Sequence, residues 1–132
     1  MVKIMNYYKK ILIAILLLPI FIYFLIVNNT NSIIYDFKNC IKCNDISQEI
    51  SSTELYRYYY DDFQGTVADA DVNIKRIFVF HNFNKGIMYV KYSCEKYDQS
   101  GNHLYGSSNV YAKWYIEKNE GRWVVVKVEE NP

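Results

Sequence analysis

Three cysteines are the residues whose spacing comes nearest to a known reactive pattern. Cys40 and Cys43 form a Cys-x-x-Cys pair, and Cys94 follows much later. A thioredoxin-type redox pair is expected at a strand-to-helix junction, whereas no strand pattern precedes Cys40. A zinc site needs four ligands, so Cys94 and a histidine would have to join the pair through the fold. We expect a structural disulfide among the three cysteines, with reduced thiols as the alternative and the pairing left open.

The histidines and a pair of aspartates are the other candidates for chemistry. His81 and His103 are the only histidines, and no fixed spacing links either one to a carboxylate that could complete a general acid and base pair. His81 lies in a strand pattern and is expected to pack, while His103 lies in a turn. Asp69-Ala70-Asp71 resembles a metal-binding pair but is typical of a solvated turn. We expect no enzymatic activity, no cofactor and no metal.

An unbroken apolar run determines on which side of a membrane we expect these residues. Residues 11–27 carry no charge, and Lys3, Lys9 and Lys10 precede them. Seventeen residues at about 1.5 Å each give a helix of roughly 25 Å, enough to cross a thin hydrocarbon core. Because lysines stay on the cytoplasmic side, we expect a cytoplasmic N-terminus (1–10), a transmembrane anchor and an outward-facing remainder.

A cleavable signal peptide is the alternative for the same run, and it would make the protein secreted. Its positively charged start is present, but no Ala-x-Ala pattern follows, because residues 28–31 read Asn-Asn-Thr-Asn. Phe21 and Phe24 also make the end of the run bulky. We therefore expect a single-pass protein of the cell membrane with its C-terminal domain outside.

The 105 residues after the anchor suit one small domain. Twelve basic and fourteen acidic residues there give a formal net charge of −2. A weakly acidic domain argues against a nucleic-acid partner, which needs a basic surface. Abundant Asn, Ile, Lys and Tyr with scarce Ala and Pro are typical of an AT-rich bacterial genome.

Apolar residues recur with two different periods along this domain, first that of a helix and then that of strands. Residues 28–44 are polar without a sustained period and are predicted to form a linker. From residue 45 apolar side chains recur every four positions, which predicts either one long helix or a short turn followed by a main helix from about Ser52 to Gln64. After residue 71 the period falls to two. Four strands are predicted at Ile74–Phe83, Ile87–Tyr97, Leu104–Lys118 and Arg122–Glu130. The expected turns are Asn84-Lys85-Gly86, Asp98 to Asn102 and Asn119-Glu120-Gly121.

The expected fold class is therefore α+β. After an N-terminal transmembrane helix, residues 45–132 form an extracytoplasmic domain in which one main helix packs on a four-stranded antiparallel meander. Alternation predicts an inner face that packs against the helix. It would carry Met88, Val90, Tyr92, Cys94, Val110, Ala112, Trp114, Ile116, Val124, Val126 and Val128.

The opposite face mixes aromatic and charged side chains. Cross-strand pairing on a half-solvated sheet accounts for such residues, and a binding surface is the functional alternative, because Tyr and Trp supply large rigid contact areas. Its register is open, so either Arg122 or Trp123 belongs to it. The residues of this possible binding face are Tyr89, Tyr111, Tyr115 and Trp123.

The C-terminal stretch resembles the closing hairpin of small cystatin-like or NTF2-like extracytoplasmic domains of bacterial membrane-anchored proteins. The residues concerned are Tyr111 to Lys118, Gly121-Arg122-Trp123-Val124-Val125 and Val128 to Pro132. The resemblance covers roughly residues 45–132 and implies one helix packed in a curved antiparallel sheet, without inherited catalytic residues. A full NTF2-like domain usually has more helices before the sheet, so the cystatin-like form fits better.

Three functions remain open at this point. The first is a non-enzymatic, membrane-anchored module that binds a protein or peptide through the sheet face or an edge strand. The second is an immunity-type envelope protein that sequesters a toxin. The third is a small enzyme or small-molecule binder that uses the concave interior of the sheet. We favour the first.

Overall fold

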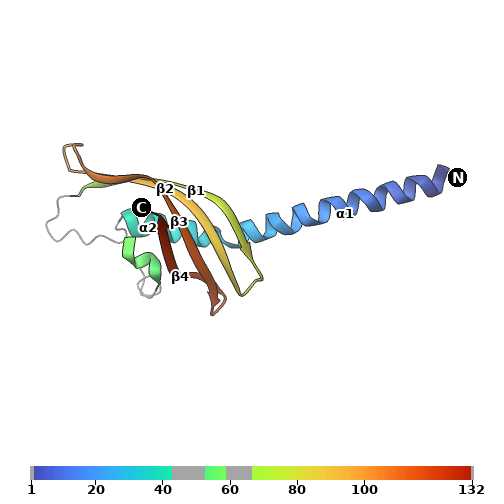
Figure 1. Cartoon of the computed structure of the whole chain (residues 1–132). Coiled ribbons are helices and arrows are strands. Elements are labelled where there is room, and N and C mark those ends of the chain that lie inside the picture. Colours follow the sequence, from blue (N-terminus) through green and yellow to red (C-terminus); the bar gives the residue numbers. More distant parts are fainter. Residues whose placement is uncertain (1, 43–52, 59–66, 132) are drawn as a thin grey trace.

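The structure is a computed structural model that describes residues 2–42, 53–58 and 67–131. Figure 1 shows a curved sheet with one helix lying against it and a second helix extending away from it. The predicted α+β class is confirmed for the described residues. In chain order they form α1 (Val2–Asn29), α2 (Asn31–Lys42), the short 3₁₀-helix η1 (Glu54–Tyr58), β1 (Asp69–His81), β2 (Lys85–Tyr97), β3 (His103–Asn119) and β4 (Arg122–Asn131).

Helix α1 contains the whole predicted apolar run. Its side chains from Tyr7 to Leu25 are exposed, and Ile26 is the first that is buried. Pro19 stands inside the helix without ending it. The helix is long and apolar enough to serve as a membrane anchor or as a signal sequence.

Helix α2 shows that the prediction of a linker over residues 28–44 is wrong for residues 31–42. It buries a stripe of side chains on the sheet, namely Ile33, Phe37, Cys40 and Ile41. Their spacing of four and three residues is helical, but the stripe is narrow and polar residues surround it. The short length of α2 hid the period, because only three turns are available to show it.

A break at Thr30 separates the two helices. The Thr30 N–H and hydroxyl both donate to the carbonyl of Val27, at 3.2 and 2.9 Å. The carbonyl of Thr30 then accepts the N–H of Ile33 in the first turn of α2. The buried threonine therefore satisfies its own polar groups while it redirects the chain.

Residues 52 and 59–64 of the predicted main helix, Ser52 to Gln64, lie outside the described residues. Residues 54–58 within it form η1, with Leu55 buried. Among the described residues, the helix packed on the sheet is thus α2.

Strands β1 to β4 form one antiparallel sheet in the order β1-β2-β3-β4, which confirms the predicted meander for the described residues. β1 begins at Asp69, earlier than predicted. Asp69 and Asp71 therefore lie in a strand, opposite Tyr97 and Glu95 of β2, rather than in a solvated loop. The turns at residues 98–102 and 119–121 lie where they were predicted.

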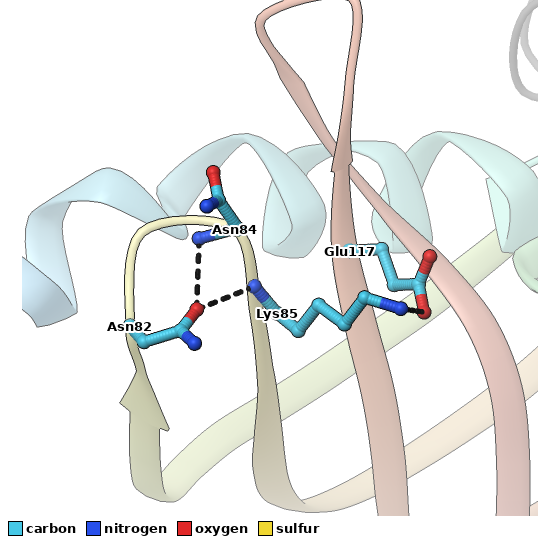
Figure 2. A network of polar contacts seen from close by, with 4 residues as sticks. All are labelled: Asn82, Asn84, Lys85 and Glu117. Atoms are coloured by element: carbon cyan, nitrogen blue, oxygen red, sulfur yellow. Dashed lines mark hydrogen bonds and ion pairs between the residues drawn. The ribbon is translucent and has the colours of Figure 1, made fainter.

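The turn between β1 and β2 differs from the predicted Asn84-Lys85-Gly86. Asn82 accepts the N–H groups of Asn84 and Lys85 on its side-chain oxygen, at 3.1 and 2.9 Å (Figure 2). Phe83, not a glycine, takes the positive φ of 70°. Gly86 instead pairs with His81 within the sheet, where a Cβ would lie 2.5 Å from the His81 Cβ.

The inner face of the sheet carries the core, as predicted for β2 and β3. Its buried residues there are Met88, Val90, Tyr92, Ala112, Trp114 and Ile116. In β4 the predicted alternation is wrong before Val128, because Trp123 and Val125 are buried while Val126 is exposed. The cause is a bulge: Tyr115 pairs with Lys127 and Ile116 with Val125, so Val126 is an extra residue.

The junction between α1 and α2 is fixed to β1. The Arg76 guanidinium donates to the Thr30 hydroxyl at 2.8 Å and to the Asn31 side-chain oxygen at 3.0 Å. The imidazole Nε2 of His81 lies 3.1 Å from the carbonyl oxygen of Ile26. α1 therefore leaves the sheet in a defined direction and is not joined to it by a flexible linker.

Candidate binding face

Three of the four residues predicted for a binding face share the outer side of the sheet. Alternation along β2 and β3 sends Tyr89, Tyr111 and Tyr115 away from the core, and each ring is partly exposed. The register then places one lysine directly opposite each tyrosine on a neighbouring strand. The pairs are Tyr89 with Lys113, Tyr111 with Lys91, and Tyr115 with Lys127. We call these six residues the tyrosine–lysine face.

Each ammonium group of this face lies over an aromatic ring. The Lys113 Nζ lies 4.7 Å from the ring centre of Tyr115 and 5.9 Å from that of Tyr89. The Lys91 Nζ lies 5.3 Å from the Tyr111 ring. Such contacts contribute about 0.5–1 kcal/mol each at exposed sites. They favour the observed ring positions, which reduces the side-chain freedom that is lost when a partner binds.

Glu129 links Tyr115 and Lys127 at the β4 side of the face. The Tyr115 hydroxyl donates to one carboxylate oxygen at 3.1 Å, and the Lys127 Nζ lies 2.7 Å from the other. The hydrogen bond from Lys127, followed by that from Tyr115, lowers the pKa of Glu129. The hydrogen bond to Glu129 likewise raises the pKa of Lys127. Both groups therefore remain charged around neutral pH.

A shallow hollow opens beside these side chains. Its volume is about 240 Å³. This is below the 300–1,000 Å³ typical of small-molecule sites and suits one side chain of a partner. The hollow is lined by Ile77, Tyr89, Val90, Tyr111, Ala112, Lys113 and Glu129.

No protein-family model, curated protein or solved structure matches this chain. The resemblance to cystatin-like and NTF2-like domains therefore stays a prediction. The chemistry of the face has to be argued from its own geometry.

Trp123 does not belong to the face, so this part of the prediction is wrong. Its side chain is 4% exposed, and its ring lies on the inner side with its centre 4.5 Å from that of His81. The bulge at Val126 changes the alternation of β4 and turns Trp123 inward.

An inner polar cluster that sequence reasoning missed lies on the other side of the sheet. Tyr58 and Tyr92 both donate their hydroxyls to one carboxylate oxygen of Glu130, at 2.6 and 2.8 Å. Burial, followed by the hydrogen bond to Glu130, raises the pKa of both phenols, so both remain neutral. No sequence signal marks this cluster, because Tyr58 and Glu130 are 72 residues apart.

The two histidines occupy different settings. His81 is buried against the end of α1, as its expected packing role requires. The Nε2 atom of His103 lies within hydrogen-bond distance of one carboxylate oxygen of Glu95, whose other oxygen accepts the Ser108 hydroxyl at 3.1 Å. The carboxylate lies between serine and histidine here. This order cannot relay a proton from the serine to the imidazole, as a nucleophilic triad would.

The residues of the predicted disulfide and the other residues weighed as metal ligands are not gathered into a site in the described part of the chain. Cys40 is buried on α2, Cys94 is half-buried on β2, and no disulfide joins these two. Cys43 lies outside the described residues, so a disulfide among the three cysteines stays a prediction. Within residues 2–42, 53–58 and 67–131, no group of three or more His, Cys, Asp and Glu is arranged to hold a metal ion.

Proposed function

We propose that this protein is a membrane-anchored, non-enzymatic module that binds a protein or peptide through its tyrosine–lysine face. The observation that carries the proposal is the placement of a lysine opposite each exposed tyrosine. Exposed tyrosine rings, which offer a large rigid contact area with a polar tip, are among the side chains that contribute most to protein recognition. The hollow beside Tyr89 and Tyr111 offers a place for one anchoring side chain.

The charges of the face favour an acidic partner. Lys75 on β1 lies directly opposite Lys91 on β2. Like charges in directly opposite positions destabilise a sheet, so this pair opposes folding of the protein alone. A carboxylate of a bound partner between the two ammonium groups would remove the repulsion. We therefore assign the partner an acidic segment at this edge of the face.

The anchor supports a location for this binding at a membrane surface. α1 is apolar and exposed along most of its length, and its lysines all precede the apolar run. Lysine-rich flanks remain cytoplasmic, so the sheet would face the extracytoplasmic side. The fixed junction at Thr30 and Ile26 would then hold the face in a constant orientation to the membrane.

Cross-linking in intact cells that carry the full chain at native expression tests this function. A zero-length reagent that joins amines to carboxylates would capture an acidic partner through the lysines of the face. One partner is expected with the wild type and to be lost in Tyr111→Ser. The matched control is Tyr35→Ser, because Tyr35 is an exposed tyrosine on α2, away from the face.

A second pair of variants tests the charge of the partner. Lys91→Gln is expected to weaken the cross-link, whereas Lys38→Gln, at an exposed position of α2, is expected to leave it unchanged. Recovery of the same partner with Tyr111→Ser and Lys91→Gln would exclude the tyrosine–lysine face. Absence of any cross-linked protein with the wild type would exclude the binding function itself.

A further inference from the structure

Three phenylalanines at the end of β1 and in the following turn are exposed. Phe78, Phe80 and Phe83 expose 43%, 57% and 49% of their surfaces. Isolated exposed apolar residues are common, but three within six positions at one end of a sheet form a local apolar tip. We call Phe78, Phe80 and Phe83 the phenylalanine tip.

Helix α1 leaves the sheet beside this tip. The ring of Tyr23 on α1 stacks on that of Phe78, with ring centres 6.3 Å apart. One turn further along α1, the carbonyl of Ile26 binds His81, and the His81 ring contacts that of Phe83 at 5.1 Å. Figure 1 shows α1 passing next to β1 as it departs from the sheet. The level of the tip along α1 therefore corresponds to residues 23–26.

This level lies inside the apolar run. The run ends at Val27, and Tyr23 precedes it by four residues, or about 6 Å of helix. The whole run of roughly 25 Å is already shorter than the hydrocarbon core of about 30 Å. If residues 11–27 occupy the bilayer, the side chains next to Tyr23 and Ile26 cannot stand in bulk water. They lie in the interfacial layer, where aromatic rings are favoured.

The turn holds Phe83 outward at a conformational cost. Its φ of 70° is an unfavourable backbone conformation for a bulky residue. Its N–H donates to the Nδ1 of His81 at 3.1 Å, and the Asn82 side chain closes the turn around it (Figure 2). Such strain is found where a side chain has to be presented in one place.

We propose that the phenylalanine tip inserts into the interfacial layer of the same lipid bilayer that α1 crosses. This inference rests on the proposed membrane anchor. The tip supplies the second attachment that a short anchor lacks and fixes the tilt of the sheet above the membrane. The lipid is the occupant because α1 and the tip reach the same depth and share the Tyr23–Phe78 contact.

Tryptophan fluorescence in vesicles tests the depth of the tip. The full chain is reconstituted in phosphatidylcholine vesicles whose lipids carry bromine, a quencher, near the headgroup or near the chain ends. Phe83→Trp and Phe80→Trp report on the tip, and the buried Trp114 and Trp123 give the wild-type background. Phe80 has no positive φ, so its variant avoids the strained position. Leu104→Trp is the control, because Leu104 is exposed beside the opposite turn of the sheet.

Both tip variants are expected to lose most of their added fluorescence with bromine near the headgroup, and Leu104→Trp is expected to lose none. A further variant, Phe21→Trp, reports on the apolar run of α1 itself. If Phe21→Trp is quenched while both tip variants are not, the anchor stands and the inserted tip is excluded. If Phe21→Trp is not quenched either, the anchor itself fails, and the inference fails with it.

Discussion

The imidazole of His81 donates its Nε2 hydrogen to the backbone carbonyl of Ile26, 3.1 Å away, and joins the end of β1 to the last turn of α1. The Nδ1 atom accepts the N–H of Phe83 at 3.1 Å. Because Nδ1 acts as an acceptor, the ring is neutral and carries its single hydrogen on Nε2. The Thr30 N–H donates to the carbonyl of Val27. His81 therefore satisfies the carbonyl of Ile26, which lies in the last turn of α1, where carbonyls lack intrahelical donors. A neutral imidazole is thus part of the joint between α1 and the sheet.

Acidification is expected to weaken this joint. Burial lowers the pKa of His81 below its ordinary value of 6.5, so the unfolded chain binds this proton more strongly than the folded protein does. The contribution of His81 to stability is therefore complete above about pH 7 and decreases as the pH falls below about 6.5. The free energy of unfolding of the full chain in detergent micelles, followed by tryptophan fluorescence in urea, measures this decrease.

Two histidine variants separate His81 from other titrating groups. His81→Gln keeps a donor but does not titrate, so it is expected to reduce the decline between about pH 7 and pH 5. We expect it to cost about 1–3 kcal/mol at neutral pH, because its fit to Ile26 and Phe83 is poorer. His103→Gln is measured in parallel, and the part of the decline that only His81→Gln removes is assigned to His81. The same pH profile in His81→Gln and wild type would contradict the assignment.

The buried and exposed ion pairs of the sheet are expected to differ in their contributions. The Arg122 guanidinium lies 2.9 and 2.8 Å from the two oxygens of Asp36, whose residue is 7% exposed. Asp36→Ala is expected to cost about 2 kcal/mol, below the 3–5 kcal/mol of a fully buried pair, because Arg122 still reaches water. Glu117→Ala breaks the exposed 3.0 Å pair with Lys85 (Figure 2) and is expected to cost less than about 1 kcal/mol. Equal losses in urea unfolding would contradict this.

Local signals in the sequence account for what could be predicted of the fold. The alternation along β2 and β3 and the turns at residues 98–102 and 119–121 depend on neighbouring residues, and these predictions are confirmed. Which side chains of β4 face inward could not be predicted, because the extra residue Val126 is defined only by the pairing of β4 with β3. Helix α2 was missed because its burial depends on the sheet, which lies far along the chain.

The candidate face was predicted in part for the same reason. The outward direction of Tyr89, Tyr111 and Tyr115 follows from alternation within β2 and β3. The lysine opposite each tyrosine depends on register, which the sequence left open. The Tyr58–Glu130 hydrogen bond and the His81–Ile26 contact join residues far apart in the chain, and no periodic pattern reports them.

The two glycines Gly86 and Gly101 are expected to respond differently to the same substitution. A Cβ at Gly86 would lie 2.3 Å from the carbonyl oxygen of Phe80, so Gly86→Ala forces two strands apart. We expect a loss of about 2–3 kcal/mol. Gly101 has a φ of 80° and no atom near its Cβ position, so Gly101→Ala is expected to cost only about 1 kcal/mol of backbone strain. Thermal unfolding of both variants makes the comparison, and a larger loss for Gly101→Ala would overturn it.

Helix α2 is expected to contribute strongly to the stability of the sheet domain. Phe37 is fully buried, and its ring centre lies 4.9 to 5.2 Å from those of Tyr58, Tyr92 and Trp114. Phe37→Ala should leave a cavity in this cluster and cost about 3–5 kcal/mol. Tyr35→Ala, at a position 67% exposed on the same helix, is expected to change stability by less than about 0.5 kcal/mol. Similar urea midpoints for the two variants would contradict a stabilising role of α2 and would be the result expected if residues 31–42 were only a linker.

The orientation of α1 is expected to depend on the lysines before its apolar run. In cells that carry the full chain with a C-terminal epitope tag, external protease should remove the tag from the wild type, because lysines before an apolar run, here Lys3, Lys9 and Lys10, favour a cytoplasmic N-terminus. Replacing these three lysines by Gln is expected to give a mixed population in which part of the tag is protected. Lys38→Gln is the control and should remain fully accessible. A protected tag in the wild type would reverse the orientation, and a mature chain that begins after Val27 would replace the anchor by a signal sequence.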